Sequence, residues 1–202
     1  MNLIGTLAIA IGSSWVSGIR LYAAVATLGL LGRFANLHLP GDLDVLTNWW
    51  IIGIASALLV LEFFADKIAY LDSAWDVIHT FIRIPAGAVL AAAAFGDFDR
   101  RVQVVALLLG GGLALSAHGT KASARAAINL SPEPASNVVA SLFEDVVAVG
   151  SIFLAYFLPL VLIGLILIFL VVSVFLLPRI IGVLRGTFRK LRRVFAEGFR
   201  FV

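Results

Sequence analysis

Long apolar stretches, separated by short polar segments, dominate the pattern of residues along this chain. A helix needs about 20 apolar residues to cross the hydrocarbon core of a bilayer. Stretches that approach or exceed this length occupy residues 3–32, 48–65, 74–96, 102–118, 137–157 and 159–178. The pattern therefore predicts an all-α fold, a polytopic membrane helical bundle of about six spans that occupies residues 1–178.

The first apolar stretch, 3–32, is too long for one straight crossing, and the polar segment "GSSWVSGIR" lies at its centre. This segment predicts a broken helix, and whether the helix crosses the membrane or re-enters it stays open. Pro85 predicts a kink in the third stretch. Trp49 and Trp50, at the start of the second, are typical of the membrane interface.

After residue 178 the pattern becomes amphipathic. Apolar side chains recur every three or four residues, at Ile181, Leu184, Phe188, Leu191, Phe195 and Phe199. Residues 1–178 carry 8 Lys and Arg against 11 Asp and Glu, whereas residues 179–202 carry 7 against 1. We therefore expect residues 179–202 to form a basic helix that lies on anionic lipids. Because basic residues favour the cytoplasmic side, the tail is predicted there, and six crossings would put the N-terminus there as well.

The composition agrees with a membrane protein. The mean hydropathy is +1.06, and 13% of the residues are charged, whereas soluble domains average about 25%. The chain has no cysteine, which excludes disulfides, thiolate metal sites and cysteine nucleophiles. The N-terminal apolar run lacks a preceding basic region, so we interpret it as a retained span and not as a signal peptide.

Motifs of the common enzyme classes are not found. The sequence contains no G-x-S-x-G, no H-E-x-x-H and no glycine-rich phosphate loop, so neither an enzyme nor a cofactor is expected. The net charge of +3 arises from the tail and does not indicate a nucleic-acid partner.

The two halves of the chain share an order of features. "SGIRLYAAVATL" (17–28) aligns with "HGTKASARAAIN" (118–129), and each contains a basic residue after a glycine. "LVLEFFAD" (59–66) aligns with "ASLFEDVV" (140–147), and each contains acidic residues within an apolar run. Three spans in each half, 1–97 and 102–178, would make these inverted repeats of the kind that builds many transporters.

Charged residues inside the apolar stretches are the main candidates for function. A charge at the bilayer centre costs about 2.5–3.5 kcal/mol, so such residues should pair or face a polar cavity. Glu62 and Glu144 lie in corresponding helices of the two halves and are flanked by apolar residues. With Asp145, Arg20 and Lys121 they form the predicted ion- or substrate-binding set. The alternative is that the two glutamates form structural ion pairs with Arg20 and Lys121.

A second set of polar residues falls at helical spacings. It contains Asp66, Asp76, His79, Arg83, His118 and Arg125. Asp76, His79 and Arg83 share one helix face, which is either functional or a polar face that satisfies itself. Asp66, Lys67 and Asp72 are interpreted as a short cytoplasmic loop. Whether any of these residues holds a metal stays open.

Two long segments carry a family resemblance. "FFADKIAYLDSAWDVIHTFIRIPAGAVLAA" and "LALSAHGTKASARAAINLSPEPASNVVASLFEDVVAVG" resemble the signature blocks of a bacterial membrane family, domain of unknown function 4126, over residues of about 15–155. The resemblance implies a small multi-pass protein of the bacterial inner membrane and no established activity. The chain has "IRIPAGA" (82–88) where the family often has "IRPPAGA", a change that affects the local kink alone.

These observations predict a small transporter or channel that moves a cation, a proton or a small polar solute past buried carboxylates. The alternative is a lipid flippase or scramblase, or a protein that binds anionic lipids, in which Arg20, Arg83, Lys121 and Arg125 meet phosphate head groups. The expected partners are the bilayer, anionic lipids at the tail, and a small ion or solute. Assembly into a homo-oligomer, or a role as an accessory subunit, stays open.

Overall fold

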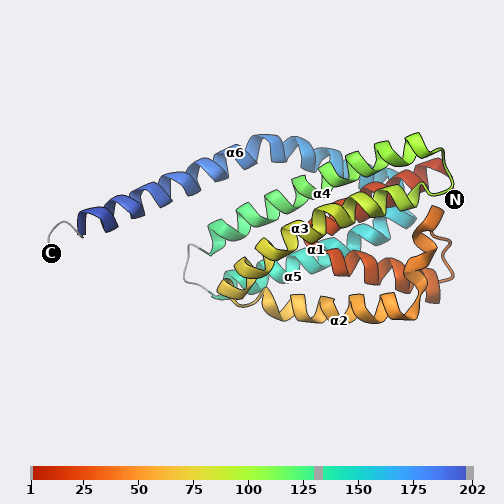
Figure 1. Cartoon of the computed structure of the whole chain (residues 1–202), viewed down its shortest axis with the longest axis horizontal. Coiled ribbons are helices and arrows are strands. Elements are labelled where there is room, and N and C mark those ends of the chain that lie inside the picture. The colour runs from red at the N-terminus through yellow and green to blue at the C-terminus, as the bar shows by residue number, and fades with distance from the viewer. Residues whose placement is uncertain (1, 130–133, 199–202) are drawn as a thin grey trace.

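The computed structural model describes residues 2–129 and 134–198, and in this part of the chain short loops join helices and no strand is present. The helices are α1 (Leu3–Phe34), the short 3₁₀ helix η1 (Gly41–Thr47), α2 (Trp49–Ala65), α3 (Ala69–Ala94), α4 (Arg100–Ile128), α5 (Pro134–Phe157) and α6 (Pro159–Gly198) (Figure 1). By length and composition α1, α3, α4, α5 and α6 can each cross a membrane, and η1 with α2 forms a sixth candidate, bent by 74°. The prediction of an all-α, multi-pass membrane bundle is confirmed.

Side chains at the helix starts explain where several helices begin. The Asn2 side chain accepts a hydrogen bond from Gly5 N at 2.8 Å, and the Asn48 side chain accepts one from Trp50 N at 2.9 Å. Asp99 caps α4 in the same way. Proline is the first residue of α5 and of α6, a position where its missing N–H costs nothing.

The surface of the bundle is apolar and several ionisable side chains lie inside, as expected in lipid. Trp50 and Phe81 are 81% and 79% exposed, whereas Arg20 and Arg83 are fully buried. α1 lies at the centre and packs against each of the other five α-helices. The buried ionisable side chains come from the outer helices as well as from α1, and they point toward the interior of the bundle.

The helix α1 is broken at Arg20. The backbone of Arg20 is not helical (φ −147°, ψ 78°), so residues 3–19 and 21–34 form two separate arms. In the first arm, Leu7 lines an apolar cavity with Phe95, at the end of α3. The second arm ends at Phe34, whose ring meets that of Trp49, the first residue of α2, at 5.6 Å.

Both arms of α1 end at the same end of the bundle. Gly41 of η1 packs against Gly96, just after α3, and Gly29 of the second arm packs against Leu46 of η1. α1 is therefore a re-entrant helical hairpin with Arg20 at its tip, inside the bundle (Figure 1). The sequence left open whether the broken first helix crosses the membrane or re-enters it, and the structure shows that it turns back.

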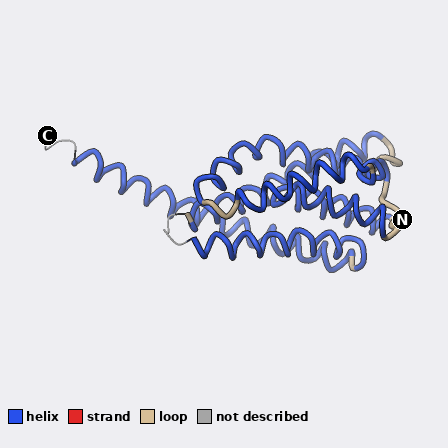
Figure 2. Tube along the Cα trace, turned by 90° about the horizontal axis from the view of Figure 1, so that it is seen from below, coloured by secondary structure: helices blue, strands red, loops and turns tan. Residues whose placement is uncertain are grey.

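The re-entrant form of α1 corrects the predicted position of the N-terminus. Because α1 returns to its starting side, five helices cross the bundle, from α2 to α6. The start of α1 and the far end of α6 consequently lie at opposite ends of the molecule (Figures 1 and 2). Six crossings would have placed both on one side.

The two halves of the chain differ in form. α1 is broken, whereas α4, its counterpart in the predicted repeat, runs as one helix from Arg100 to Ile128. This pair of helices gives the inverted repeat no structural support, and the repeat stays a prediction from sequence order.

Two helices, α4 and α6, continue ten residues or more past the ends of their predicted apolar stretches. α4 continues ten residues past the predicted end at 118, to Ile128, because its alanines favour helix and its basic side chains find acidic partners inside. α3 continues through Pro85, and α6 continues through Pro178 to Gly198. The tail is therefore a continuation of the last span. The structure does not describe the side chains of Leu184, Phe188, Leu191, Phe195 and Phe199, so the predicted apolar face of the tail lies outside the described residues.

Candidate functional site

Ten ionisable side chains from five helices meet inside the bundle, and we call them the central charge cluster. The cluster contains Arg20, Glu62, Asp66, Asp72, Asp76, Arg83, Lys121, Arg125, Glu144 and Asp145. Ion pairs of 4 Å or less connect all ten into one network. The end of α2, the start of α3, the end of α4 and the start of α5 contribute nine members, and the tip of α1 contributes Arg20.

The tip of α1 is held in place by polar contacts with α3. Ser14 Oγ donates a hydrogen bond to Gly87 O at 2.8 Å, and Ser17 Oγ donates one to Arg83 O at 2.8 Å. A Cβ on Gly18 would overlap Ala114 O of α4, so the glycine permits the close approach of α1 and α4. Small and hydroxylated residues thus bring Arg20 to the centre of the bundle.

Arg20 connects α1 to α2 and α5. Its Nη1 lies 2.8 Å from Asp66 Oδ2, and its Nε lies 3.1 Å from Asp145 Oδ1. Its Nη2 donates a hydrogen bond to Ser141 Oγ at 2.8 Å and lies 3.7 Å from Glu144 Oε2. Although Glu144 and Asp145 are adjacent on α5, both lie within 4 Å of the same guanidinium.

Arg83 organises the second part of the cluster. It pairs with Glu62 through Nη2 and with Asp76 Oδ1 through Nη1 at 2.7 Å. Its Nη1 also lies 3.5 Å from His118 Nδ1, and the other ring nitrogen of His118 lies 2.7 Å from Thr80 Oγ1. Asp76 and Arg83, predicted on one helix face, therefore pair with each other. Both also form ion pairs with other members of the cluster.

Lys121 and Arg125 join the two parts. Lys121 Nζ lies between three carboxylates, 3.4 Å from Glu144, 3.5 Å from Asp76 and 3.6 Å from Asp66. It donates a hydrogen bond to Ile19 O at 3.1 Å. Arg125 binds Glu144 with two hydrogen bonds, of 2.8 and 2.9 Å. The arginine pair is tight, whereas the lysine has three partners at similar distances.

The predicted residues meet in the structure. All five principal candidates belong to the central charge cluster: Arg20, Glu62, Lys121, Glu144 and Asp145. Four of the secondary candidates belong to it as well: Asp66, Asp76, Arg83 and Arg125. His79 and His118 border it, and His79 Nε2 lies 3.0 Å from the hydroxyl of Tyr22.

Two expectations need correction. Asp66 and Asp72 do not form a solvated loop, since both side chains are fully buried and face Arg125 at 3.6 and 3.9 Å. The turn between α2 and α3 spans three residues, 66–68, so it directs both carboxylates inward. The alternative that both glutamates form ion pairs with Arg20 and Lys121 is correct for Glu144, which lies 3.7 and 3.4 Å from them. It is wrong for Glu62, which pairs with Arg83.

Sequence reasoning missed Asp72. A signal was present, because Asp72 lies four residues before Asp76 and eleven before Arg83, on the face that already contained these residues. It precedes the apolar span that begins at Ala74. Burial raises the pKa of its carboxyl to about 6, although the nearby Arg125 guanidinium opposes this shift.

The cluster carries more negative than positive groups. Four cations and six carboxylates leave a formal charge of −2 among the described residues when all are ionised. Several buried carboxylate oxygens have no hydrogen-bond donor in the described part: Glu62 Oε2, Asp66 Oδ1 and Asp145 Oδ2. No three acidic or histidine side chains among the described residues are placed to hold a metal ion.

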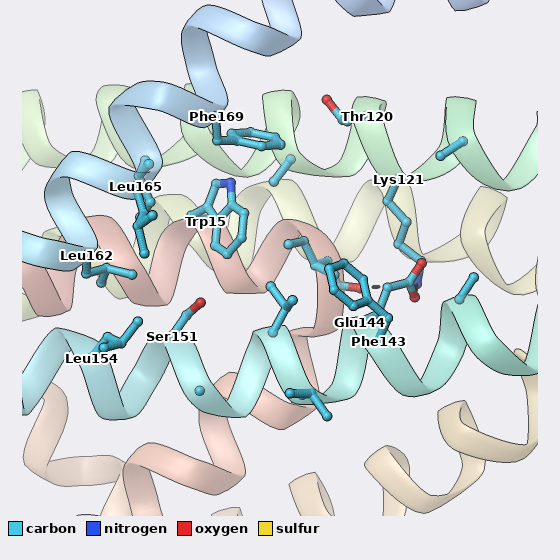
Figure 3. Close-up of a pocket in the computed structure, with 18 of the residues that line it drawn as sticks. Trp15, Thr120, Lys121, Phe143, Glu144, Ser151, Leu154, Leu162, Leu165 and Phe169 are labelled. Carbon is cyan, nitrogen blue, oxygen red and sulfur yellow. Dashed lines mark hydrogen bonds and ion pairs between the residues drawn. The ribbon is translucent and has the colours of Figure 1, made fainter.

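A cavity of about 670 Å³ reaches the cluster from between α1, α4, α5 and α6. Its walls are mostly apolar, and Trp15, Phe143 and Phe169 contribute aromatic rings. Lys121, Arg125 and Glu144 form its charged end. Figure 3 shows the Lys121 side chain extending toward the Glu144 carboxylate, with Trp15 beside Phe169 farther along the cavity, toward Leu162.

Comparison with known families gives one result. The family described as domain of unknown function 4126 matches residues 7–179. The chain belongs to this family. The match confirms the resemblance and extends it beyond residues 15–155, so the domain 4126 region contains the whole central charge cluster and the cavity. Most of the basic tail lies outside it. No curated protein and no solved structure matches the chain.

Proposed function

We propose that this protein is a small membrane transporter or channel that moves a proton or another small cation through the central charge cluster. The observation that carries the proposal is the formal charge of −2, together with the unpaired oxygens of Glu62 and Asp66. An uncompensated charge is costly in a low-dielectric interior. Protons or small cations that reach the cluster would relieve this cost.

The geometry around Lys121 supports movement of charge through the cluster. Three carboxylates lie 3.4–3.6 Å from its Nζ, and none is distinctly closer than the others. When a proton or cation neutralises one of these carboxylates, the ammonium group can move toward another with little displacement. The cluster therefore has alternative pairings of similar geometry, which a binding site with two states requires.

The species is better described as a proton or a monovalent cation than as a multivalent metal ion. Divalent ions prefer several oxygen ligands around one point, and the described residues provide no such group. Single unpaired carboxylate oxygens, in contrast, each suffice to accept one proton.

Flux into proteoliposomes tests the proposal. Purified protein is reconstituted with a pH-sensitive dye inside, and a potassium diffusion potential drives proton entry. We expect Glu62→Gln and Glu144→Gln to lower the proton flux, since each removes a carboxylate of the cluster. Asp97→Asn, in an exposed loop, is the matched control and should leave the flux unchanged. The same assay with sodium or potassium gradients identifies the ion.

An unchanged proton and cation flux in both glutamine variants would contradict the proposal. Thermal unfolding of each variant in detergent separates loss of transport from loss of fold, because a folded variant without flux has lost function alone.

A lipid flippase or scramblase is the second candidate, and the cavity favours it. The apolar walls have room for an acyl chain, and Lys121 and Arg125 stand at the inner end. Transfer of a fluorescent phospholipid between the leaflets of proteoliposomes, together with absent ion flux, would favour this function over ion transport.

A further inference from the structure

The ammonium group of Lys121 lies in a cage of oxygen atoms that come from four other helices of the bundle. Its Nζ lies 3.1 Å from Ile19 O, at the end of the first arm of α1. The other oxygens belong to the carboxylates of Glu144 on α5, Asp76 on α3 and Asp66 at the end of α2, at 3.4, 3.5 and 3.6 Å. The cage therefore exists because the fold brings these helices together around α4.

The break in α1 supplies the carbonyl oxygen of the cage. The last four carbonyl groups of a helix have no N–H partner within that helix, and the non-helical backbone of Arg20 makes Ile19 the last residue of the first arm. Backbone carbonyl oxygens at such breaks coordinate the coupling cation in many transporters. In this protein the oxygen of Ile19 accepts a hydrogen bond from the Lys121 ammonium group, which is itself a cation.

Lys121 fits the cage loosely. Hydrogen bonds between an ammonium group and a carboxylate are about 2.7–2.9 Å long, whereas the three carboxylates lie 3.4–3.6 Å from Nζ. Of the three N–H groups of Lys121, one donates a hydrogen bond to the described residues, at Ile19 O. A bare ion has no N–H groups to direct at acceptors, so oxygens placed around a point suit it better than they suit an ammonium group.

An unpaired oxygen and the charge of the cluster both indicate a cation at this place. Asp66 is fully buried, and its Oδ1 has no hydrogen-bond donor among the described residues. Without the charge of Lys121, three cations would face six carboxylates in the described part of the central charge cluster, a formal charge of −3. Because a buried net charge is costly, the cage strongly favours a cation in place of the ammonium group.

We propose that the cage around Lys121 Nζ is a binding site for a monovalent cation of about the size of potassium or ammonium, and that Lys121 is a tethered cation that competes for it. This inference rests on the proposed transport of cations and assigns the place where the ion binds. Lys121 also lines the cavity between α1, α4, α5 and α6, so its side chain has room to withdraw when an ion enters (Figure 3). The exchange of one cation for another leaves the charge of the cage unchanged.

Removal of the tethered cation tests the site. Lys121→Ala vacates the cage, and we expect its melting temperature in detergent to rise by at least about 5 °C when potassium or ammonium chloride replaces choline chloride at the same ionic strength. The wild type should respond little, because its own ammonium group fills the cage. Lys67→Ala is the matched control and should respond as the wild type does, since Lys67 Nζ donates its hydrogen bond to the backbone oxygen of Phe63.

A second substitution tests whether the carboxylates of the cage hold the ion. Asp76→Asn, added to Lys121→Ala, should weaken the apparent affinity for potassium in the same assay by at least about tenfold. Unchanged affinity in the double variant would place the ion elsewhere. An equal response to potassium in Lys121→Ala, Lys67→Ala and the wild type would be a general salt effect, and an absent response in Lys121→Ala would mean that no ion replaces the ammonium group. Each of these results overturns the proposal.

Lys121→Gln extends the test to the case in which Lys121→Ala does not fold, because the amide retains a hydrogen-bond donor for Ile19 O. It should show the same preference for potassium and ammonium over choline. Recovery of either variant in folded form with potassium, and not with choline, would support the site. Failure of both variants to fold in every salt would show that an ion cannot take the place of the ammonium group, and would overturn the proposal.

Failure of this inference differs from failure of the proposed function. Cation flux in the wild type, together with a Lys121→Ala variant whose stability ignores potassium, overturns the cage and leaves transport standing. Stability of Lys121→Ala that depends on potassium, without flux of any cation in the wild type, supports the site and contradicts transport.

Discussion

At the residue scale, the protein places charges in a membrane bundle by surrounding each cation with carboxylates. Arg83, which is fully buried, contacts two carboxylates. Arg125 donates one hydrogen bond to each carboxylate oxygen of Glu144. Isolated charges at such depth would cost several kcal/mol each. The same arrangement leaves acidic groups in excess, so stability and ion binding depend on the same side chains.

Removal of Arg83 is predicted to destabilise the protein strongly. Arg83→Met leaves the buried Glu62 carboxylate without a cation, and we expect a loss of about 3–5 kcal/mol. The double variant with Glu62→Met should recover part of this loss, since an apolar pair of similar volume replaces the ion pair. Unfolding in detergent measures both. Arg33→Met, at an exposed arginine that stacks on Trp49, is the control and should change the free energy of unfolding little. An equally small change in Arg83→Met would refute the prediction.

The carboxyl of Asp72 is predicted to make stability depend on pH. Burial raises its pKa to about 6, and the nearby Asp76 and Asp66 carboxylates reinforce this shift. The Arg125 guanidinium and a hydrogen bond donated by Asn129 oppose it. The folded protein therefore holds this proton at pH values where the unfolded chain has released it, so the carboxyl destabilises the fold as pH rises toward 6.

Asp72→Asn tests this dependence. The asparagine carries no charge at any pH, so the variant should gain in melting temperature relative to the wild type as pH rises from 4 to 7. Thermal unfolding of both proteins across this range measures the difference. A difference that stays constant, or that shrinks with rising pH, would show that Asp72 does not titrate in this window.

At the element scale, the re-entrant hairpin α1 determines the position of the site. Its two arms pack between the crossing helices, and its tip brings Arg20 to three carboxylates from α2 and α5. Such close packing depends on small residues. Gly18 lies against the backbone of Ala114, and Gly87 lies against Ser14.

Replacement of Gly18 is predicted to displace the hairpin. The methyl group of Gly18→Ala would overlap Ala114 O and come within 2.8 Å of the Ala117 side chain, and we expect a destabilisation of about 1–3 kcal/mol. Gly119→Ala on α4 is the matched control, because nothing lies within 4 Å of its added carbon. It should be neutral or up to about 1 kcal/mol stabilising. Equal melting temperatures in the two variants would contradict the close packing of α1 on α4.

At the scale of the whole molecule, five crossing helices surround one re-entrant hairpin in the described part of the chain, and the start of α1 and the far end of α6 lie at opposite ends (Figure 1). The far end of α6 lies on the same side of the bundle as the turn between α2 and α3, which contains Lys67 (Figure 1), and residues 179–202 contain 7 of the 15 Lys and Arg of the chain. From the positive-inside rule we propose that the C-terminus is cytoplasmic and that the N-terminus lies on the opposite side of the membrane.

Single cysteines test this topology, since the natural chain has none. Leu3→Cys and Asp97→Cys are at the end that we place outside, and Gly186→Cys is beyond the last apolar span. In intact cells a membrane-impermeant maleimide should label the first two, and Gly186→Cys should react after permeabilisation. Equal labelling of Leu3→Cys and Gly186→Cys in intact cells would instead indicate that both termini share one side.

Much of the fold and of the cluster was predictable because hydropathy and helical spacing are local properties. Apolar stretches located the crossing helices, and the cost of burying charge required that residues such as Glu144 and Lys121 find partners. Spacings of four and seven residues placed Asp76 and Arg83 on one face. The pairing of particular cations with particular acids was not predictable, because it depends on which helices are neighbours.

The sequence alone thus determined a lipid-embedded helical bundle and most members of the central charge cluster, since both follow from transfer free energies and periodicity along the chain. The family followed from the resemblance of two long segments. Tertiary structure decided that α1 turns back at Arg20, that Asp66 and Asp72 face inward, and that a cavity opens beside Glu144. The physical reason is that one non-helical residue reverses the chain, and contacts from α2, α3, α4 and α5, distant in sequence, hold that reversal in place.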